Sequence, residues 1–234
     1  DQGRVIDFYA GLTLSGENAM LIGDCITRNQ DINRIIYRPI IELKIDNEIY
    51  WLIGRNKWLE SLTTLSTNAL SFGVCAPEWL KYESIKKFIV RVANYHDKIL
   101  ENPIEELLRK YKRKFARNIK AVQASKSHHI RIDKKGIGEI DFLYIDDNNE
   151  TLYVIECKHN RSRFDMFNWR RDYTNFKNNY EDQLLKKVDW CRANKHNINF
   201  HFNSQYPNES FRINDYLVRG IFVINAPTFY MYNG

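Results

Sequence analysis

The chain has 234 residues, of which 44% are hydrophobic, 14% aromatic and 27% charged, and its formal net charge is +6. This composition excludes a disordered chain and allows one large folded domain or two small ones. No apolar run approaches about eighteen residues, so no membrane span is expected. The N-terminal DQGRVIDFYA is too polar for a cleavable signal peptide, and the lack of an initial Met suggests a piece of a longer protein.

The four cysteines are widely spaced and form no CxxC pair: Cys25, Cys75, Cys157 and Cys191. This spacing indicates neither a zinc site nor a disulfide framework. Reduced thiols are therefore expected, together with a cytoplasmic location.

The first hundred residues predict a small α+β region. Residues 1–30 indicate little beyond a short strand or helix and a loop around 15–18. Two β-rich runs within 34–54 flank a polar turn, which predicts a hairpin. Because proline cannot donate to a ladder, Pro39 makes the first run an edge strand or places its start after the proline.

Two helices are expected next. Residues 56–71 carry apolar side chains near helical spacing, and Pro77 can open a second helix. A break at 101–103 then predicts a boundary between an N-terminal region, 1–100, with a recognition or assembly role, and a second domain, 101–234.

The second domain begins with a strong amphipathic pattern from Pro103, in which Ile104, Leu108 and Phe115 share one face. We then expect a strand, a hairpin, a long helix, a polar loop and a buried strand, in this order: 121–132, 138–158, 170–193, 194–210 and 217–227. The fold class is therefore α/β (an α+β mixed sheet), with a core of helix, three strands, helix and strand.

The hairpin GEIDFLYIDDNNETLYVIECK carries charge where its strands should be buried. The midpoint between Asp141 and Glu156 lies within about a residue of its turn centre, which places the two carboxylates nearly opposite each other, about 5 Å apart. Lys158 shares a strand face with Glu156 because side chains alternate along a strand.

Two opposed carboxylates repel each other, and a divalent cation removes that repulsion. Hard oxygen ligands at this separation can bind Mg²⁺, with Mn²⁺ as a substitute, while water and phosphate complete the shell. Such an ion can activate water for attack on a phosphodiester, and Lys158 can stabilise the developing charge. The alternative is a surface hairpin whose acids and lysine are solvated.

These residues resemble the PD-(D/E)XK nuclease superfamily, which includes many restriction endonucleases. Asp141 matches the acid of the second core strand, and Glu156-Cys157-Lys158 matches the (D/E)xK of the third, whereas Gly138-Glu139-Ile140-Asp141 departs from the Pro-Asp of the name. The likeness covers residues 103–227. It implies a restriction endonuclease-like core and Mg²⁺-dependent phosphodiester hydrolysis.

The resemblance also implies further site residues. An acid of the first helix often adds a metal ligand in this family, and Glu105 lies at the edge of the apolar face, although it is equally explained as a helix-terminal acid. Gln183 is the candidate for a glutamine on the helix after the third strand, against an ordinary surface amide. Cys157 would offer the metal its backbone carbonyl while its side chain faces the core.

Basic residues gather in two places that suit phosphate contacts. Within 109–120, seven of twelve residues are Lys or Arg, and a second stretch mixes arginines with Phe164, Phe167 and Trp169. The expected nucleic-acid contacts are Arg109, Lys112, Arg113, Lys114, Arg117, Arg161, Arg163, Arg170 and Arg171. A solvated helix face and a partly buried aromatic loop are the competing interpretation.

The function expected from the sequence is therefore a metal-dependent nuclease, an endonuclease acting on DNA, with RNA as an open alternative. A non-catalytic module that keeps the fold for nucleic-acid binding or assembly is the second hypothesis. A homodimer, or a place in a larger multidomain protein, fits either function.

Overall fold

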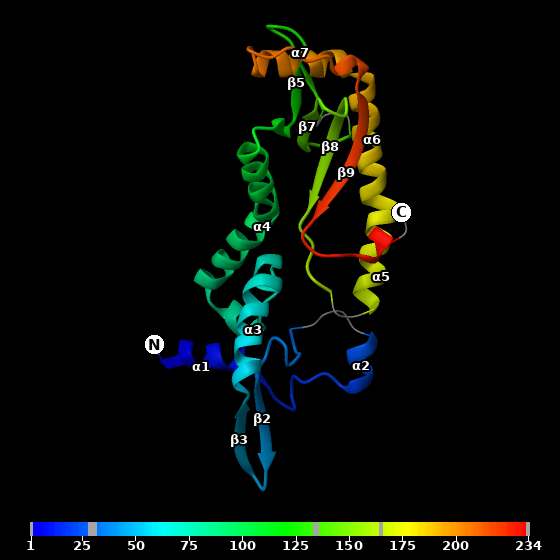
Figure 1. Ribbon diagram of the computed structural model, residues 1–234. Coiled ribbons are helices and arrows are strands. Elements are labelled where there is room, and N and C mark those ends of the chain that lie inside the picture. Colours follow the sequence, from blue (N-terminus) through cyan, green and yellow to red (C-terminus); the bar gives the residue numbers. More distant parts are fainter. Residues whose placement is uncertain (1, 28–31, 133–135, 164–165, 233–234) are drawn as a thin grey trace. The chain divides into compact units, whose positions relative to one another are not determined.

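A computed structural model of the chain describes most of its residues (Figure 1). The described residues are 2–27, 32–132, 136–163 and 166–232. They form a mixed α/β protein with one three-stranded, one four-stranded and one two-stranded sheet. Among these residues, every helix is too short or too polar to serve as a membrane span.

The chain divides into two compact units. The first contains residues 1–96 and 161–171, and the second contains 97–160 and 172–234. The segment 161–171 thus belongs to the first unit, although the sequence pattern assigned everything after residue 100 to the second domain.

The first unit holds a parallel-antiparallel sheet of order β1-β2-β3. Its elements are α1 (Gln2–Ala10), β1 (Thr13–Leu14), α2 (Ile22–Thr27), β2 (Ile40–Ile45), β3 (Glu48–Ile53), α3 (Arg55–Asn68) and two 3₁₀ turns, Leu70–Phe72 and Pro77–Lys81. The hairpin expected within 34–54 is confirmed as β2–β3, and β2 begins directly after Pro39. Pro77 opens a 3₁₀ turn, and the α-helix itself begins only at Glu83.

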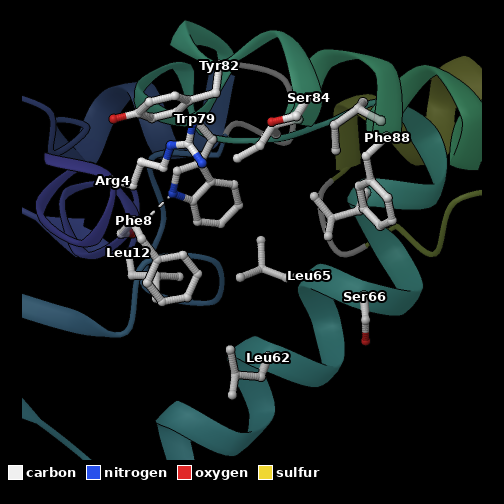
Figure 2. A pocket seen from close by; sticks show the side chains of 13 residues that line it. Arg4, Phe8, Leu12, Leu62, Leu65, Ser66, Trp79, Tyr82, Ser84 and Phe88 are labelled. Carbon is white, nitrogen blue, oxygen red and sulfur yellow. Dashed lines mark hydrogen bonds between the residues drawn. The ribbon is translucent and has the colours of Figure 1, made fainter. Parts of the chain in front are cut away.

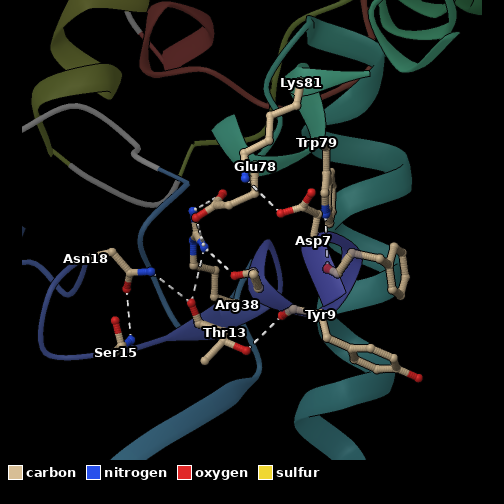
Figure 3. Close-up of polar contacts among 11 residues, drawn as sticks. Asp7, Tyr9, Thr13, Ser15, Asn18, Arg38, Glu78, Trp79 and Lys81 are labelled. Atoms are coloured by element: carbon tan, nitrogen blue, oxygen red, sulfur yellow. Dashed lines mark hydrogen bonds and ion pairs between the residues drawn. The ribbon is translucent and has the colours of Figure 1, made fainter. Parts of the chain in front are cut away.

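A buried arginine organises the first unit. Arg38 is 1% exposed, and its guanidinium donates to both carboxylate oxygens of Glu78, at 3.1 and 3.0 Å (Figure 3). It also donates to the carbonyls of Ala10 and Thr13, at 2.9 and 3.2 Å. This bidentate pair fixes the segment between α1 and β1 against the 3₁₀ turn that carries Glu78.

The second unit holds a four-stranded sheet of order β4-β7-β8-β9. The pairs β4–β7 and β7–β8 are antiparallel, and β9 runs parallel to β8. The strands are β4 (Lys114–Ile119), β7 (Ile140–Asp146), β8 (Thr151–Lys158) and β9 (Leu217–Ile224), with a separate hairpin of β5 (Ala121–Gln123) and β6 (His129–Arg131).

Helices cover both faces of this sheet. On one face, α6 (Glu181–Ala193) packs along β8 and β9 and buries Leu184 and Val188 (Figure 1). On the other face, Ile104 and Leu108 of α4 (Glu83–Lys110) pack against a cluster centred on Phe142. The remaining helices are α5 (Met166–Asn175), a π-helical turn (Phe176–Tyr180) and α7 (Lys195–Gln205). The strand expected over 217–227 and the helical run expected over 170–193 are confirmed.

The start of a helix expected at Pro103 is wrong, because α4 begins at Glu83 and continues through this proline. An internal proline removes one helical hydrogen bond and costs roughly 3 kcal/mol. Contacts on either side of Pro103 offset this cost: Arg117 binds the side chains of Glu101 and Asn102, and Ile104 packs on the sheet.

The first core strand is also not where the pattern placed it. The helix ends at Lys110. Lys112 has a positive φ of 51°, which turns the chain, and β4 begins at Lys114. Phe115 therefore lies on a strand and not on the helix. The region 121–132 supplies β5 and β6, which pair with each other outside the main sheet.

The polar loop expected over 194–210 is largely a helix, α7. Ile198 and Phe202, four residues apart, are fully buried and anchor it. Its asparagines cap neighbouring backbone, since the side-chain oxygens of Asn199 and Asn203 accept from the N–H groups of Ile213 and Phe211. The high asparagine content of this segment therefore led to the wrong prediction of a loop.

Gly220 allows α6 to approach β9. A Cβ at this position would lie 2.8 Å from Val188 Cγ2 and 2.9 Å from Leu184 Cγ, which is closer than real contacts allow. We predict that Gly220→Ala lowers the free energy of unfolding by about 1–3 kcal/mol because α6 must move outward. Urea unfolding measures the change. Arg219→Ala, an exposed neighbour on the same strand, should stay within about 0.5 kcal/mol; equal losses in both variants would contradict the packing argument.

Candidate active site

Two carboxylates meet at one end of the central strands. The β7–β8 register pairs Phe142 with Ile155 and Leu143 with Val154, so the next rung sets Asp141 opposite Glu156. Both side chains, with Lys158, therefore share the sheet face that α6 covers. The turn at 147–150 produces the register that the turn centre predicted.

Glu156 is buried, at 4% exposure, and two lysines hold its carboxylate. Lys158 Nζ donates to Oε1 at 2.8 Å, and Lys187 Nζ donates to Oε2. Lys187 comes from α6 and is itself 4% exposed. The two ammonium groups compensate a charge that would be costly to bury alone.

Asp141 lies beside this cluster, but the hydrogen bond that holds its carboxylate comes from a backbone N–H and not from a lysine. Burial, which is the larger cause, and the negative charge of Glu156 together raise the pKa of Asp141 to about 6. The backbone N–H of Cys157 donates to Asp141 Oδ2 at 2.7 Å and works in the opposite direction. Asp141 is thus the carboxylate of the pair whose charge is least compensated.

The ammonium of Lys158 lies 4.8 Å from the ring centroid of Tyr180. Burial acts to lower the pKa of Lys158, but the charge and hydrogen bond of Glu156 outweigh burial and raise the pKa above its ordinary value. Lys158 is therefore a cation, held between a carboxylate and an aromatic face.

A π-helical turn positions Tyr180. This turn, Phe176–Tyr180, joins α5 to α6, and Phe176 stacks on Tyr230 with ring centroids 5.2 Å apart. π-Helical turns often occur at functional sites because they shift the side chains that follow them. Here the turn brings Tyr180 onto Lys158 while Lys187, two turns later, reaches Glu156.

Cys157 lies between Glu156 and Lys158 on the strand and points to the opposite face. Its side chain packs against the cluster of Phe115, Phe142 and Ile155. Burial and the charge of Asp141 raise the pKa of its thiol. Cys75, Cys157 and Cys191 are free thiols, and the side chain of Cys25 lies outside the described residues.

The first-helix acid expected at the site, Glu105, is engaged elsewhere. It accepts from Arg109 at 2.6 Å and from Arg117, and these hydrogen bonds lower its pKa. Glu101, one turn earlier, contributes to the raised pKa of the Cys157 thiol and is also paired with Arg117, at 2.7 Å. Glu101 escaped notice because the expected break at 101–103 left it outside the helix.

Gln183 is exposed on α6, whereas Leu184, Lys187 and Val188 form the buried face. The structure therefore does not bring Gln183 to the carboxylates, and Lys187 occupies that face. The sequence did contain a signal for Lys187, since it lies within the apolar stripe of Leu184, Val188 and Cys191 at helical spacing. A lysine in such a stripe indicates a buried, paired charge.

The expected nucleic-acid contacts separate into engaged and exposed cations. Arg161 is buried in the first unit, where it donates to the carbonyl of Asn68 and the hydroxyl of Tyr37. Arg109 and Arg117 pair with Glu105, Lys114 pairs with Glu209, and Arg163 is half-buried. Lys112, Arg113, Arg170 and Arg171 are exposed, and the salt bridges of the described residues give Lys112 and Arg113 no carboxylate partner. Phe164 lies outside the described residues.

The first unit contains a separate apolar cavity of about 500 Å³ (Figure 2). Its walls come from α1, α3, the 3₁₀ turn at Trp79 and the start of α4, and Arg4 and Tyr82 lie at its polar side. Neither carboxylate of the candidate active site lines it. The cavity is therefore distinct from the charged cluster.

The carboxylates suit a hard cation. Within the described part of the chain no group of three or more His, Cys, Asp and Glu side chains lies close enough to hold a metal. Mg²⁺, however, commonly takes one or two carboxylates and completes its shell with water and phosphate. Asp141 and Glu156 are the two carboxylates that could hold such an ion.

Comparison of the chain with protein-family models, with curated proteins and with solved structures gives no match.

The buried ion pair between Lys187 and Glu156 predicts a stability effect. Lys187→Met leaves Glu156 with one cation, and we expect it to lower the free energy of unfolding by about 3 kcal/mol. Urea unfolding at pH 7 measures this. Lys186→Met, its exposed neighbour paired with Asp182, is the matched control and should change stability by no more than about 0.5 kcal/mol.

The double variant Lys187→Met/Glu156→Gln isolates the cause. Removing the charge of Glu156 should recover a large part of the stability that Lys187→Met loses, because no uncompensated carboxylate remains. Additive losses in the double variant would show that Lys187 acts by packing alone.

The raised pKa of Asp141 predicts the pH dependence of stability in metal-free protein. Between the unfolded value of 3.8 and the folded value of about 6, the native state holds a proton that the unfolded state has lost. Stability from this group is therefore complete below pH 3.8 and is lost as pH rises through about 6.

Asp141→Asn cannot ionise and can still accept from the Cys157 N–H. At pH 7 with EDTA it should be more stable than wild type by on the order of 1–3 kcal/mol, and the difference should shrink toward pH 4. Urea unfolding across this range is the measurement. A variant that is less stable at pH 7, or a difference independent of pH, would contradict the assignment.

Proposed function

We propose that the chain is a divalent-cation-dependent nuclease, an endonuclease that acts on DNA. The observation that carries the proposal is the arrangement of Asp141, Glu156 and Lys158 on one sheet face at the end of two central strands. A buried acid opposed to a second acid, with a lysine two residues away, suits metal-assisted phosphodiester hydrolysis.

The fold supports the same proposal. The C-terminal half of α4 is followed by β4, β7 and β8, which are antiparallel, then by α5 and α6, and finally by β9 parallel to β8. This is the order of helix, three strands, helix and strand expected of a PD-(D/E)XK nuclease, with the β5–β6 hairpin inserted after the first strand. We therefore propose a restriction endonuclease-like core for the second unit.

Asp141 and Glu156 would hold the ion, Mg²⁺ or Mn²⁺. When bound, the cation would neutralise charge on the scissile phosphate and supply an activated water. Orienting Glu156 and contacting the phosphate are roles of two lysines, Lys187 and Lys158.

Lys187 and Lys158 have different roles in this proposal. Lys187 is buried and holds Oε2 of Glu156, so that the carboxylate keeps its orientation independently of Lys158. Lys158 is more accessible, with 23% of its side chain exposed, against 6% for Lys187. Lys158 can therefore turn from Oε1 to a phosphate oxygen, while Tyr180 keeps its ammonium close to the site.

DNA is the proposed polyanion because the chain is basic overall and keeps exposed cations. Lys112 and Arg113 in the turn before β4 have no carboxylate partner in the described salt bridges, so their charges are open to phosphates. The arginines Arg170 and Arg171 are likewise exposed, in the first unit. RNA offers the same phosphates, and substrate comparison decides between the two.

The test is cleavage of supercoiled plasmid and of duplex, single-stranded and branched oligonucleotides with Mg²⁺ or Mn²⁺. We predict cation-dependent cleavage that EDTA abolishes, and a loss of about 100-fold or more in Asp141→Ala and Lys158→Ala. Lys186→Ala, an exposed lysine on α6, is the control and should cleave like wild type. Wild-type protein that cleaves none of these substrates with either ion would refute the proposal.

One observation favours the second candidate, a non-catalytic nucleic-acid-binding module. Both carboxylate oxygens of Glu156 are occupied by lysines, and such an ion-pair network can serve stability alone. Electrophoretic mobility shifts of the same substrates separate the two. Binding without cleavage, unchanged in Asp141→Ala but weakened in a Lys112→Ala/Arg113→Ala variant, would favour the binding module.

A further inference from the structure

Strand β3 presents an open edge of unusual composition. It is the terminal strand of the β1-β2-β3 sheet, and among the described residues no strand pairs with its outer side. All six of its residues are exposed, with Ile49 at 61%, Trp51 at 69% and Ile53 at 56%. The strand EIYWLI contains no lysine or proline, which commonly prevent edge pairing in soluble proteins, and its one charged residue is Glu48 at the start.

The geometry of the hairpin determines which backbone groups face outward. Asp46 and Asn47 both have positive φ, 50° and 66°, and Ile45 pairs with Glu48 directly beside this two-residue turn. In such a hairpin the pair next to the turn exchanges hydrogen bonds, and every second pair does the same. The N–H and C=O groups of Ile49, Trp51 and Ile53 therefore point away from β2.

We propose that a second copy of this chain occupies that edge, β3 against β3 in antiparallel orientation about a two-fold axis. With Trp51 opposite its own copy, Ile49 lies opposite Ile53 of the second copy and Ile53 opposite Ile49. The outward groups then coincide on both strands and form about six backbone hydrogen bonds. The two three-stranded sheets become one continuous sheet.

Charge along the strand favours the antiparallel copy. The start of β3 is acidic, with Asp46 and Glu48, and two residues after its end stands the cation Arg55, whereas Lys57 is already paired with Glu60. Antiparallel pairing sets the acidic start of one copy beside the basic end of the other, twice, by symmetry. Parallel pairing would set like charges together and is disfavoured.

The size of the contact sets the expected strength. One six-residue strand from each copy gives an interface at the small end of the range for specific complexes. The dimer should therefore dissociate on dilution. Sedimentation velocity of the intact chain between about 1 and 100 µM should show a concentration-dependent shift from monomer to dimer.

The first pair of variants distinguishes pairing at the β3 edge from non-specific hydrophobic association. Trp51→Lys places two lysines opposite each other on the two-fold axis and should give a monomer throughout the range. Leu43→Lys removes an exposed apolar residue of β2, which does not form the edge, and should still dimerise. Dimerisation lost in Leu43→Lys and kept in Trp51→Lys would overturn the proposal in favour of a sheet-face contact.

A charge exchange tests the orientation without altering the apolar strand. Glu48→Arg and Arg55→Glu should each weaken self-association about tenfold or more, because each creates like-charge neighbours across the axis. An equimolar mixture of the two variants should associate again, since the pairing of unlike copies restores opposite charges. Circular dichroism and thermal melting establish that each variant is folded.

Two outcomes would overturn the proposal. A wild-type chain that stays monomeric at about 100 µM would mean that no second copy occupies the edge. A wild-type dimer that neither Trp51→Lys nor the charge variants affect would place the contact elsewhere on the molecule. Both outcomes are independent of nuclease activity, so they leave the proposed function untouched.

Discussion

The burial of the Glu156 carboxylate is the constraint on which the second unit depends. A carboxylate at 4% exposure must be neutralised, and here the two cations come from different elements, Lys158 from β8 and Lys187 from α6. The ion pair with Lys187 therefore joins the helix to the strand beside the apolar contacts of Leu184 and Val188. Hydrophobic packing brings α6 to the sheet, and the charge pair sets its rotation and height.

The first unit also buries charged side chains, but there the buried charges are positive. Its buried charges are arginines, Arg38 and Arg161, and each is held by hydrogen-bond acceptors from distant segments. Arg38 has a carboxylate partner in Glu78, whereas Arg161 uses a carbonyl and a tyrosine hydroxyl. Planar guanidinium groups suit such multiple acceptors. One arginine that the sequence pattern assigned to a nucleic-acid surface, Arg161, is buried in this unit. Composition cannot distinguish a buried arginine from an exposed one.

Local chemistry predicted the hairpins and failed at long-range contacts. The β7–β8 register followed from strand alternation and the turn centre, because both act within twenty residues. Lys187 could not be assigned to the site, since its partner lies 31 residues away and a lysine is normally solvent-facing. The continuity of α4 through Pro103 depends on Arg117, and α7 depends on Ile198 and Phe202, so tertiary contacts overrode the local rules. The mistaken helix start also concealed Glu101.

The charge balance of the site bears on how it can act. Asp141 and Glu156 carry two negative charges when ionised, and Lys158 and Lys187 carry two positive charges, so the cluster is close to neutral. A site of two acids and one lysine would attract a cation more strongly and repel a phosphate. Lys187 shifts this balance toward the phosphate, because it remains on Glu156 while Lys158 is free to move. Within the proposed function, cation and substrate should therefore bind together rather than in sequence: the phosphate adds the negative charge that the neutral cluster lacks for holding a divalent ion.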